Sequence, residues 1–290
     1  MTASTRAVLT WIGALFGVAG TAFVAARLYA YWGVIDVAGI GRGGYVLIVL
    51  LAVIYGAANL LLAFAWGELL RHLGVERPLR WTIWAYATSQ LAKYAPGNVL
   101  QFLGRQALGV AAGTPNLPLA KSTLLELVVV GCTAALFAPL ALPLVWPAIG
   151  WAVASGLFVL CLAIGWAAAL RFWGSRIAAA ALLHCLFLIV SGLCFAVAFL
   201  IVGGSAGPGR IAMLSGAFVV AWLAGLVTPG APAGVGVREA VLLWLLSGVA
   251  TDTTTLLAVV AGRLITVAGD LLFYAAGQLA AFRTGMDDRS

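Results

Sequence analysis

Long apolar runs with few polar positions divide the chain into segments of membrane-spanning length. A helix needs about 20 apolar residues to cross the hydrocarbon core of a bilayer. The pattern predicts full spans at residues 8–32, 45–67, 117–140, 147–170, 177–203, 210–228 and 253–282. The first run is too long for the apolar region of a secretory signal peptide, so we interpret it as a span. We predict an all-α polytopic membrane helix bundle with about seven or eight spans.

Two further apolar segments, 81–112 and 229–249, are interrupted. The first contains Pro96-Gly97 and the second begins with Pro229-Gly230. Proline lacks a donor N–H and glycine is flexible, so neither segment continues as one regular helix. Unpaired backbone at membrane depth is costly unless protein or water satisfies it. We therefore predict two broken, re-entrant helical elements that line a cavity.

The composition places the whole chain in the membrane. Hydrophobic residues make up 64% of the 290 residues and charged residues only 9%, whereas soluble domains carry roughly a quarter charged residues. No stretch is polar enough for a soluble domain, so we predict one integral membrane domain over 1–290. We expect it in the plasma (inner) membrane.

The charge and the rare residue types exclude several classes of partner. The net charge of +7 fits the excess of Lys and Arg in the cytoplasmic loops of membrane proteins. The sequence has no basic run and no aromatic platform for RNA, so we expect no nucleic-acid partner. It has two histidines and no metal-ligand spacing among its four cysteines, so we expect neither a metal nor another cofactor.

Polar residues recur at helical spacing inside the apolar segments. Asn98, Gln101 and Arg105 fall at i, i+3 and i+7, on one face of a helix that Asn98 could cap. In the last span, Arg263, Thr266, Asp270, Tyr274 and Gly277 form one stripe. Charged residues at mid-membrane depth are costly and mark functional sites. The candidate binding residues are Lys93, Asn98, Gln101, Arg105, Glu126, Arg238, Glu239, Arg263 and Asp270.

Several of these residues also have a structural interpretation. Arg263 and Asp270 could form a pair that only holds helices together, and Glu126 could pair locally with Lys121 near the interface. His184 is more typical of a packing histidine than of a proton relay. Asn59 fits an interhelical hydrogen bond, the usual role of a polar residue between membrane helices.

The two interrupted segments resemble one another, which indicates an internal pseudo-repeat. Pro96-Gly97 is followed by Arg105 and by Ser122-Thr123-Leu124-Leu125, and Pro229-Gly230 is followed by Arg238 and by Thr254-Thr255-Leu256-Leu257. Corresponding Gly/Pro-interrupted segments in two halves of a chain point to the binding site of a transporter. The pattern leaves open whether the repeats are parallel or inverted.

Taken in order, these motifs resemble the membrane domain of lysylphosphatidylglycerol synthases and its stand-alone relatives, a family linked to lipid flipping. The most specific part is Gly234-Val235-Gly236-Val237-Arg238-Glu239, and the similarity covers about 80–280. The resemblance implies two re-entrant elements that face a central cavity, with arginines and glutamates at the site. Many relatives have Pro-Gly-Gly-Leu-Gly where this chain has a longer loop from Pro229 to Gly234. The aminoacyl-transferring domain has no counterpart here.

The candidate charges favour an anionic ligand. Four cations face three carboxylates, and half-helices that start after each break would aim positive N-termini at the cavity. Phosphate fits the planar fork of arginine. We predict a flippase for an anionic, phosphate-containing lipid head group. An accessory or scaffold subunit of a membrane transferase is the main alternative, and an enzyme acting on lipid-linked phosphate is less favoured because no nucleophile or metal motif is present. The sequence is compatible with a homo-oligomer and with a partner transferase.

Overall fold

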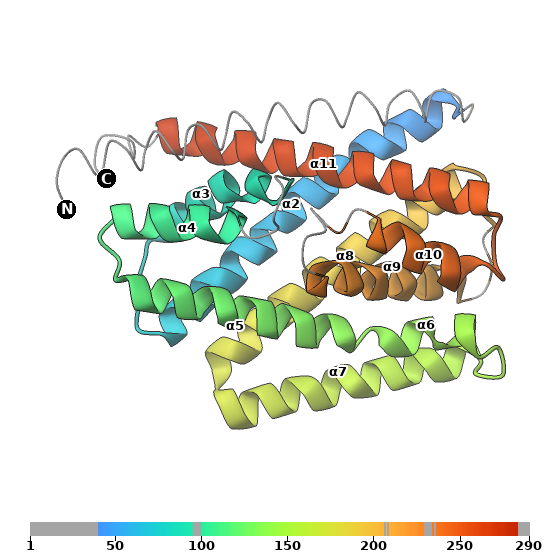
Figure 1. The fold of residues 1–290 in the computed structure, drawn as a ribbon, viewed down its shortest axis with the longest axis horizontal. Helices are drawn as coiled ribbons and strands as arrows, with labels where there is room; N and C mark the ends of the chain where they lie inside the picture. The colour runs from blue at the N-terminus through green and yellow to red at the C-terminus, as the bar shows by residue number, and fades with distance from the viewer. Residues whose placement is uncertain are drawn as a thin grey trace.

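The computed structural model describes residues 40–94, 100–205, 207, 209–228, 234 and 236–283. The expected first span, both Pro-Gly breaks and Asn98 lie outside these residues. Every regular element in the described ranges is a helix, which confirms the all-α class. The described helices pack into one bundle, with α2 and α8 crossing its middle (Figure 1).

Six described helices are long and apolar enough to cross a membrane, as expected for a multi-pass membrane protein. The predicted number of seven or eight spans is not reached within the described residues. The six helices are α2 (Arg42–His72), α5 (Asn116–Ala135), α7 (Trp151–Trp173), α8 (Ser175–Ile201), α9 (Arg210–Val227) and α11 (Asp252–Arg283).

The span expected at 117–140 is two helices. Helix α5 ends at Ala135, and the short α6 (Ala138–Val145) follows after Leu136 and Phe137. Pro139 lies in the first turn of α6, where its missing N–H breaks no intrahelical bond, whereas in the middle of one continuous helix it would. The proline thus favours a new helix over the extension of α5.

Both interrupted segments contain helices too short to cross a bilayer. The first consists of α3 (Leu79–Gln90), a 3₁₀ turn η1 (Leu91–Tyr94) and α4 (Leu100–Ala111). The second contains α10 (Val237–Leu246). At 1.5 Å per residue, helices of 10 to 12 residues reach about 15–18 Å, roughly half of the ~30 Å hydrocarbon core.

The two short-helix regions lie at opposite ends of the bundle. Helices α3 and α4 pack together at the end where α2 finishes, and α10 packs on α9 at the end where α8 finishes (Figure 1). The series α2, α3–α4, α5 therefore runs in the opposite direction to the series α8, α9–α10, α11. These opposite directions are the ones that an inverted repeat requires, one of the two alternatives that the sequence left open.

Close helix packing joins the two halves at one glycine pair. A Cβ on Gly56 of α2 would lie 2.8 Å from the carbonyl oxygen of Gly269 on α11, and a Cβ on Gly269 would lie 2.7 Å from the carbonyl oxygen of Ala52. Small residues allow membrane helices to approach in this way. The crossing places Tyr55 and Asn59 of α2 beside Asp270 of α11.

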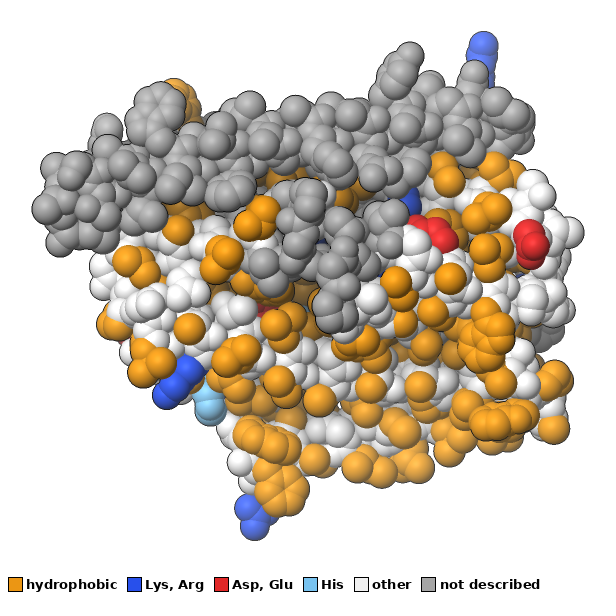
Figure 2. Space-filling model, viewed as in Figure 1, with side chains coloured by type: hydrophobic (Ala, Val, Ile, Leu, Met, Phe, Trp, Pro, Cys, Tyr) orange, Lys and Arg blue, Asp and Glu red, His pale blue; other side chains and the backbone are white. Residues whose placement is uncertain are grey.

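The surface of the bundle is apolar. On α7, large side chains such as Val153, Val159 and Ile164 are exposed, and hydrophobic side chains cover much of the lower part of the face in Figure 2, over α5 to α7. Soluble monomers rarely expose so large an apolar surface. An apolar surface of this kind is suited to contact with lipid.

Candidate functional site

A cavity of about 100 Å³ lies among α2, α3, α4, α5, α8, α9, α10 and α11. Such a volume holds several water molecules or a small polar group. Of the nine candidate residues, six line it: Lys93, Gln101, Arg105, Glu126, Arg238 and Arg263. Glu239 and Asp270 contact the lining residues from behind, and Asn98 lies outside the described residues.

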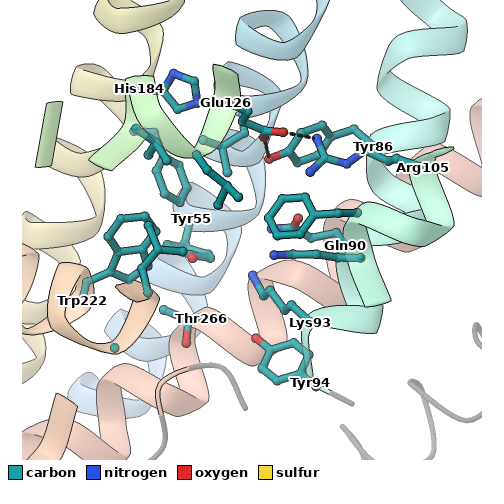
Figure 3. A pocket seen from close by; sticks show the side chains of 18 of the residues that line it. Tyr55, Tyr86, Gln90, Lys93, Tyr94, Arg105, Glu126, His184, Trp222 and Thr266 are labelled. Atoms are coloured by element: carbon teal, nitrogen blue, oxygen red, sulfur yellow. Dashed lines mark hydrogen bonds and ion pairs between the residues drawn. The ribbon is translucent and has the colours of Figure 1, made fainter. Parts of the chain in front are cut away.

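Arg105 and Glu126 form a buried ion pair at one end of the cavity (Figure 3). An Arg105 terminal nitrogen lies 2.8 Å from Glu126 Oε2, and Tyr86 donates a hydrogen bond of 2.8 Å to Glu126 Oε1. The guanidinium also lies over the Tyr86 ring, 4.2 Å from its centroid. The alternative pairing of Glu126 with Lys121 is wrong, because Glu126 is buried against Arg105 whereas Lys121 is exposed.

Asp270 is fully buried and accepts hydrogen bonds from three residues on two elements. Lys93 Nζ of η1 lies 2.7 Å from Oδ2, Tyr94 also donates to Oδ2, and Asn59 of α2 donates to Oδ1 at 3.1 Å. Asn59 in turn accepts a bond of 3.1 Å from Gln90, which confirms its expected interhelical role. With three donors around it, the Asp270 carboxylate can be buried without a water molecule to satisfy its oxygens.

The alternative of a direct Arg263–Asp270 pair is wrong. Seven residues separate them, so they lie about 10 Å apart along α11. Arg263 instead pairs with Glu239 of α10, with its Nη2 2.9 Å and its Nε 3.2 Å from Oε1. Arg263 and Asp270 on α11 thus pair with different short-helix regions: Arg263 with Glu239 of α10, and Asp270 with Lys93 of η1.

Glu239 caps the N-terminus of α10. Its Oε2 accepts a hydrogen bond of 2.6 Å from the backbone N–H of Gly236, so the carboxylate occupies the first turn of the helix. The sequence predicted that this half-helix would aim its positive N-terminal end at the cavity. The Glu239 carboxylate adds a negative charge to the same first turn.

Arg238 differs from the other cavity cations. Within the described part of the chain, no carboxylate lies within 4.0 Å of it, and its buried Nε has no hydrogen-bond partner. Its guanidinium lies 5.8 Å from the centroid of the Trp222 ring. Burying a charge without a partner is costly, so this position requires either water or an anion.

Two glycines make room for the Arg238 side chain. A Cβ on Gly225 of α9 would lie 3.0 Å from Arg238 Cγ, and a Cβ on Gly234 would lie 2.7 Å from Arg238 Nε. Gly234 also has φ +68°, a conformation that other residues rarely adopt. The backbone before α10 and the end of α9 therefore approach closely, and Arg238 fills the space between them.

The pairs leave the cavity with one excess positive charge. Lys93, Arg105 and Arg263 each have a carboxylate partner, whereas Arg238 has none among the described residues. Arg263 lies near Arg238 and repels it electrostatically. An anion between the two would relieve this repulsion and supply hydrogen-bond acceptors, which a phosphate group does well.

The cavity also includes residues that the sequence did not single out as site residues. Aromatic and polar side chains complete its wall, namely Tyr55, Tyr86, Gln90, Tyr94, Phe102, His184, Phe187 and Trp222. Most lie within regular apolar helices, where their types are equally typical of packing. Gln90 carried a usable signal, since it stands in the same broken segment as Lys93 and Gln101.

The site contains no metal-binding cluster among the described residues: no three His, Cys, Asp or Glu side chains lie close enough to hold an ion. Comparison of the chain with protein-family models and with curated protein sequences finds no match.

Proposed function

We propose that the protein moves an anionic lipid with a phosphate-containing head group across the membrane. The head group would occupy the cavity while its acyl chains stay in the surrounding lipid. The observation that carries the proposal is Arg238, a cavity-lining guanidinium that has no carboxylate within 4.0 Å among the described residues. The motif similarity to the membrane domain of lysylphosphatidylglycerol synthases agrees with this function.

The carboxylates of the site fit a binding cycle. Three of the four cavity cations have partners at 2.7–2.9 Å, so their burial without ligand is compensated. Arg238 would make the first contact with an entering phosphate, and Arg263 could share it at the cost of its bond to Glu239. Asp270, behind the cavity wall, holds Lys93 in place at the cavity.

The inverted arrangement supports movement from one side to the other. The short helices α3–α4 and α10 lie at opposite ends of the bundle (Figure 1), and both regions contribute cations to the same cavity. Transporters with inverted repeats place their substrate site between the repeats and open it alternately to each side. We propose that both regions are re-entrant in the membrane and that each gates one side.

The test is lipid translocation by the purified chain in liposomes. Acyl-labelled fluorescent phosphatidylglycerol is incorporated, and the fraction that a membrane-impermeant reductant can quench is followed over time. We expect Arg238→Gln to slow translocation about 10- to 100-fold, because a hydrogen bond to a charged group contributes about 1.5–3 kcal/mol. The matched control is Arg80→Gln, which removes an exposed arginine outside the cavity and should leave the rate unchanged.

Two outcomes would contradict the proposal. One is a wild-type rate for Arg238→Gln in protein that elutes as a folded monodisperse species. The other is a wild-type chain that moves no lipid when reconstituted alone, as an accessory subunit of a transferase would behave. Mass spectrometry of the liposome lipids separates translocation from an enzymatic reaction, since a flippase leaves every lipid mass unchanged.

A further inference from the structure

His184 lines the cavity and has one buried ring nitrogen without a hydrogen-bond partner among the described residues. It lies on α8, is fully buried and is part of the cavity wall. Its Nδ1 lies 2.7 Å from the carbonyl oxygen of Ala180, one turn earlier in the same helix. Its Nε2 has no hydrogen-bond partner among the described residues. Packing alone, the role expected from the sequence, does not account for a polar atom left in this state.

The bond to Ala180 fixes what the other nitrogen can do. A carbonyl oxygen only accepts hydrogen bonds, so Nδ1 carries a proton. In the neutral imidazole, Nε2 is then an acceptor with a free lone pair. The neutral form is also the one that the surroundings favour, since the cavity already has more cations than carboxylates. His184 therefore requires a donor, an O–H or an N–H.

The His184 end of the cavity differs from the Arg238 end. His184 and Glu126 lie along one edge of the site, and Thr266, Lys93 and Tyr94 lie along the opposite edge (Figure 3). Arg238, Arg263 and Thr266 line a second, smaller space together, which places the two arginines near the Thr266 edge. A ligand that spans the cavity would thus meet cations at one end and an acceptor at the other.

The charges at the His184 end favour a neutral donor. Glu126 is the one carboxylate among the described residues that line this cavity, and it is already paired with Arg105 at 2.8 Å and with the Tyr86 hydroxyl. An ammonium group would have no unpaired counter-charge there among the described residues, and it would meet Arg105 at close range. A hydroxyl group requires no counter-charge and satisfies Nε2 with one hydrogen bond.

We propose that His184 is a specificity-determining residue that selects head groups with a neutral hydroxyl beyond the phosphate. The phosphate binds at Arg238, and the hydroxyl donates to His184 Nε2. This inference rests on the proposed function and narrows its substrate class to hydroxylated anionic head groups. Under this proposal, His184 alone distinguishes head groups that carry the same phosphate but differ in their hydroxyls.

The test uses two lipids that differ only in the hydroxyls. Phosphatidylglycerol and phosphatidylpropanol have the same charge and the same number of head-group carbons. Their acyl-labelled forms are compared in the liposome assay, singly and in competition. We expect the wild-type protein to move phosphatidylglycerol about 3- to 10-fold faster, the range that one neutral hydrogen bond gives. Phosphatidylethanolamine, which carries an ammonium group, should not compete better than phosphatidylpropanol.

Two substitutions separate selectivity from folding. His184→Phe keeps an aromatic ring but removes the acceptor, so it should move both anionic lipids at the phosphatidylpropanol rate. His184→Gln keeps an acceptor near the position of Nε2 and should retain part of the preference. A variant that lost activity through misfolding would lose both lipids equally, which the phosphatidylpropanol rate reveals.

The outcomes distinguish this inference from the function on which it rests. If wild-type protein moves both anionic lipids at one rate, or if His184→Phe keeps the preference, the role of His184 is wrong while translocation through Arg238 stands. Preference for phosphatidylethanolamine would also overturn it. If no lipid moves, or if Arg238→Gln moves lipid normally, the proposed function itself fails.

Discussion

At the scale of single residues, Asp270 shows how a carboxylate is tolerated inside an apolar helix. Its two oxygens accept bonds from Lys93, Tyr94 and Asn59, which come from η1 and α2. Two partners lie in η1 and one on α2, so the carboxylate on α11 joins the first short-helix region to both long helices. Buried pairs of this kind contribute little net stability but are costly to break.

Replacing only Asp270 should therefore lower the free energy of unfolding more than replacing both Asp270 and Lys93. We expect Asp270→Leu to destabilise the folded protein by about 3–5 kcal/mol, because Lys93 would remain largely buried without its counter-charge. The double variant with Lys93→Met should recover a large part of this loss. The measurement is a double-mutant cycle of unfolding free energies in detergent.

A surface pair supplies the reference for that cycle. Arg176→Gln removes a half-exposed arginine that lies 2.7 Å from Glu68, and exposed pairs contribute about 0–1 kcal/mol. Additive losses for Lys93→Met and Asp270→Leu would show that the two residues are not energetically coupled.

At the scale of elements, the crossing of α2 and α11 depends on the absence of two side chains. The backbone of each helix occupies the space in which the Cβ of the other would lie, at Gly56 and Gly269. Asp270 follows Gly269 directly, so the distance between the two helices also sets the geometry of the Asn59–Asp270 hydrogen bond.

A single methyl group at this crossing should separate the helices. We expect Gly56→Ala to destabilise the protein by about 1–3 kcal/mol through overpacking and to lower its thermal midpoint in detergent. Gly156→Ala is the matched control, since a Cβ at Gly156 on α7 meets nothing within 4 Å. There the loss of a helix-interior glycine should be neutral or stabilising by up to about 1 kcal/mol. Equal midpoints for the two variants would contradict this account of the crossing.

At the scale of the whole molecule, the two short-helix regions enter from opposite ends, so their connecting turns should be reached from opposite sides of the membrane. In a variant whose four native cysteines are replaced by alanine, we expect Glu76→Cys before α3 to react with an impermeant maleimide from one side only. Thr253→Cys at the start of α11 should react only from the other side. Both positions are exposed.

A third position tests the direction of the intervening helices. Ser175→Cys lies at the turn between α7 and α8, at the same end of the bundle as the start of α3 (Figure 1). It should therefore label together with Glu76→Cys. Labelling of Glu76→Cys and Thr253→Cys from the same side would exclude the inverted arrangement.

The apolar pattern was sufficient to predict the helices, because every position in a membrane helix has to satisfy its backbone internally and face lipid or protein. It also marked the broken segments, since proline and glycine act on the local backbone. The break between α5 and α6 was missed although Pro139 lies there, because proline is tolerated in many membrane helices.

The sequence by itself also predicted that Lys93, Glu126, Arg238 and Asp270 lie at the site, because each stands in an apolar segment where a charge is costly. Only the tertiary structure decided how they pair. Partners such as Lys93 and Asp270, or Arg105 and Glu126, lie on different helices, and their distance depends on crossings such as that at Gly56. For the same reason, only the fold shows that Arg238 lacks a carboxylate partner among the described residues. Only the fold likewise shows that His184, on the wall of the same cavity, has a ring nitrogen without a partner among them.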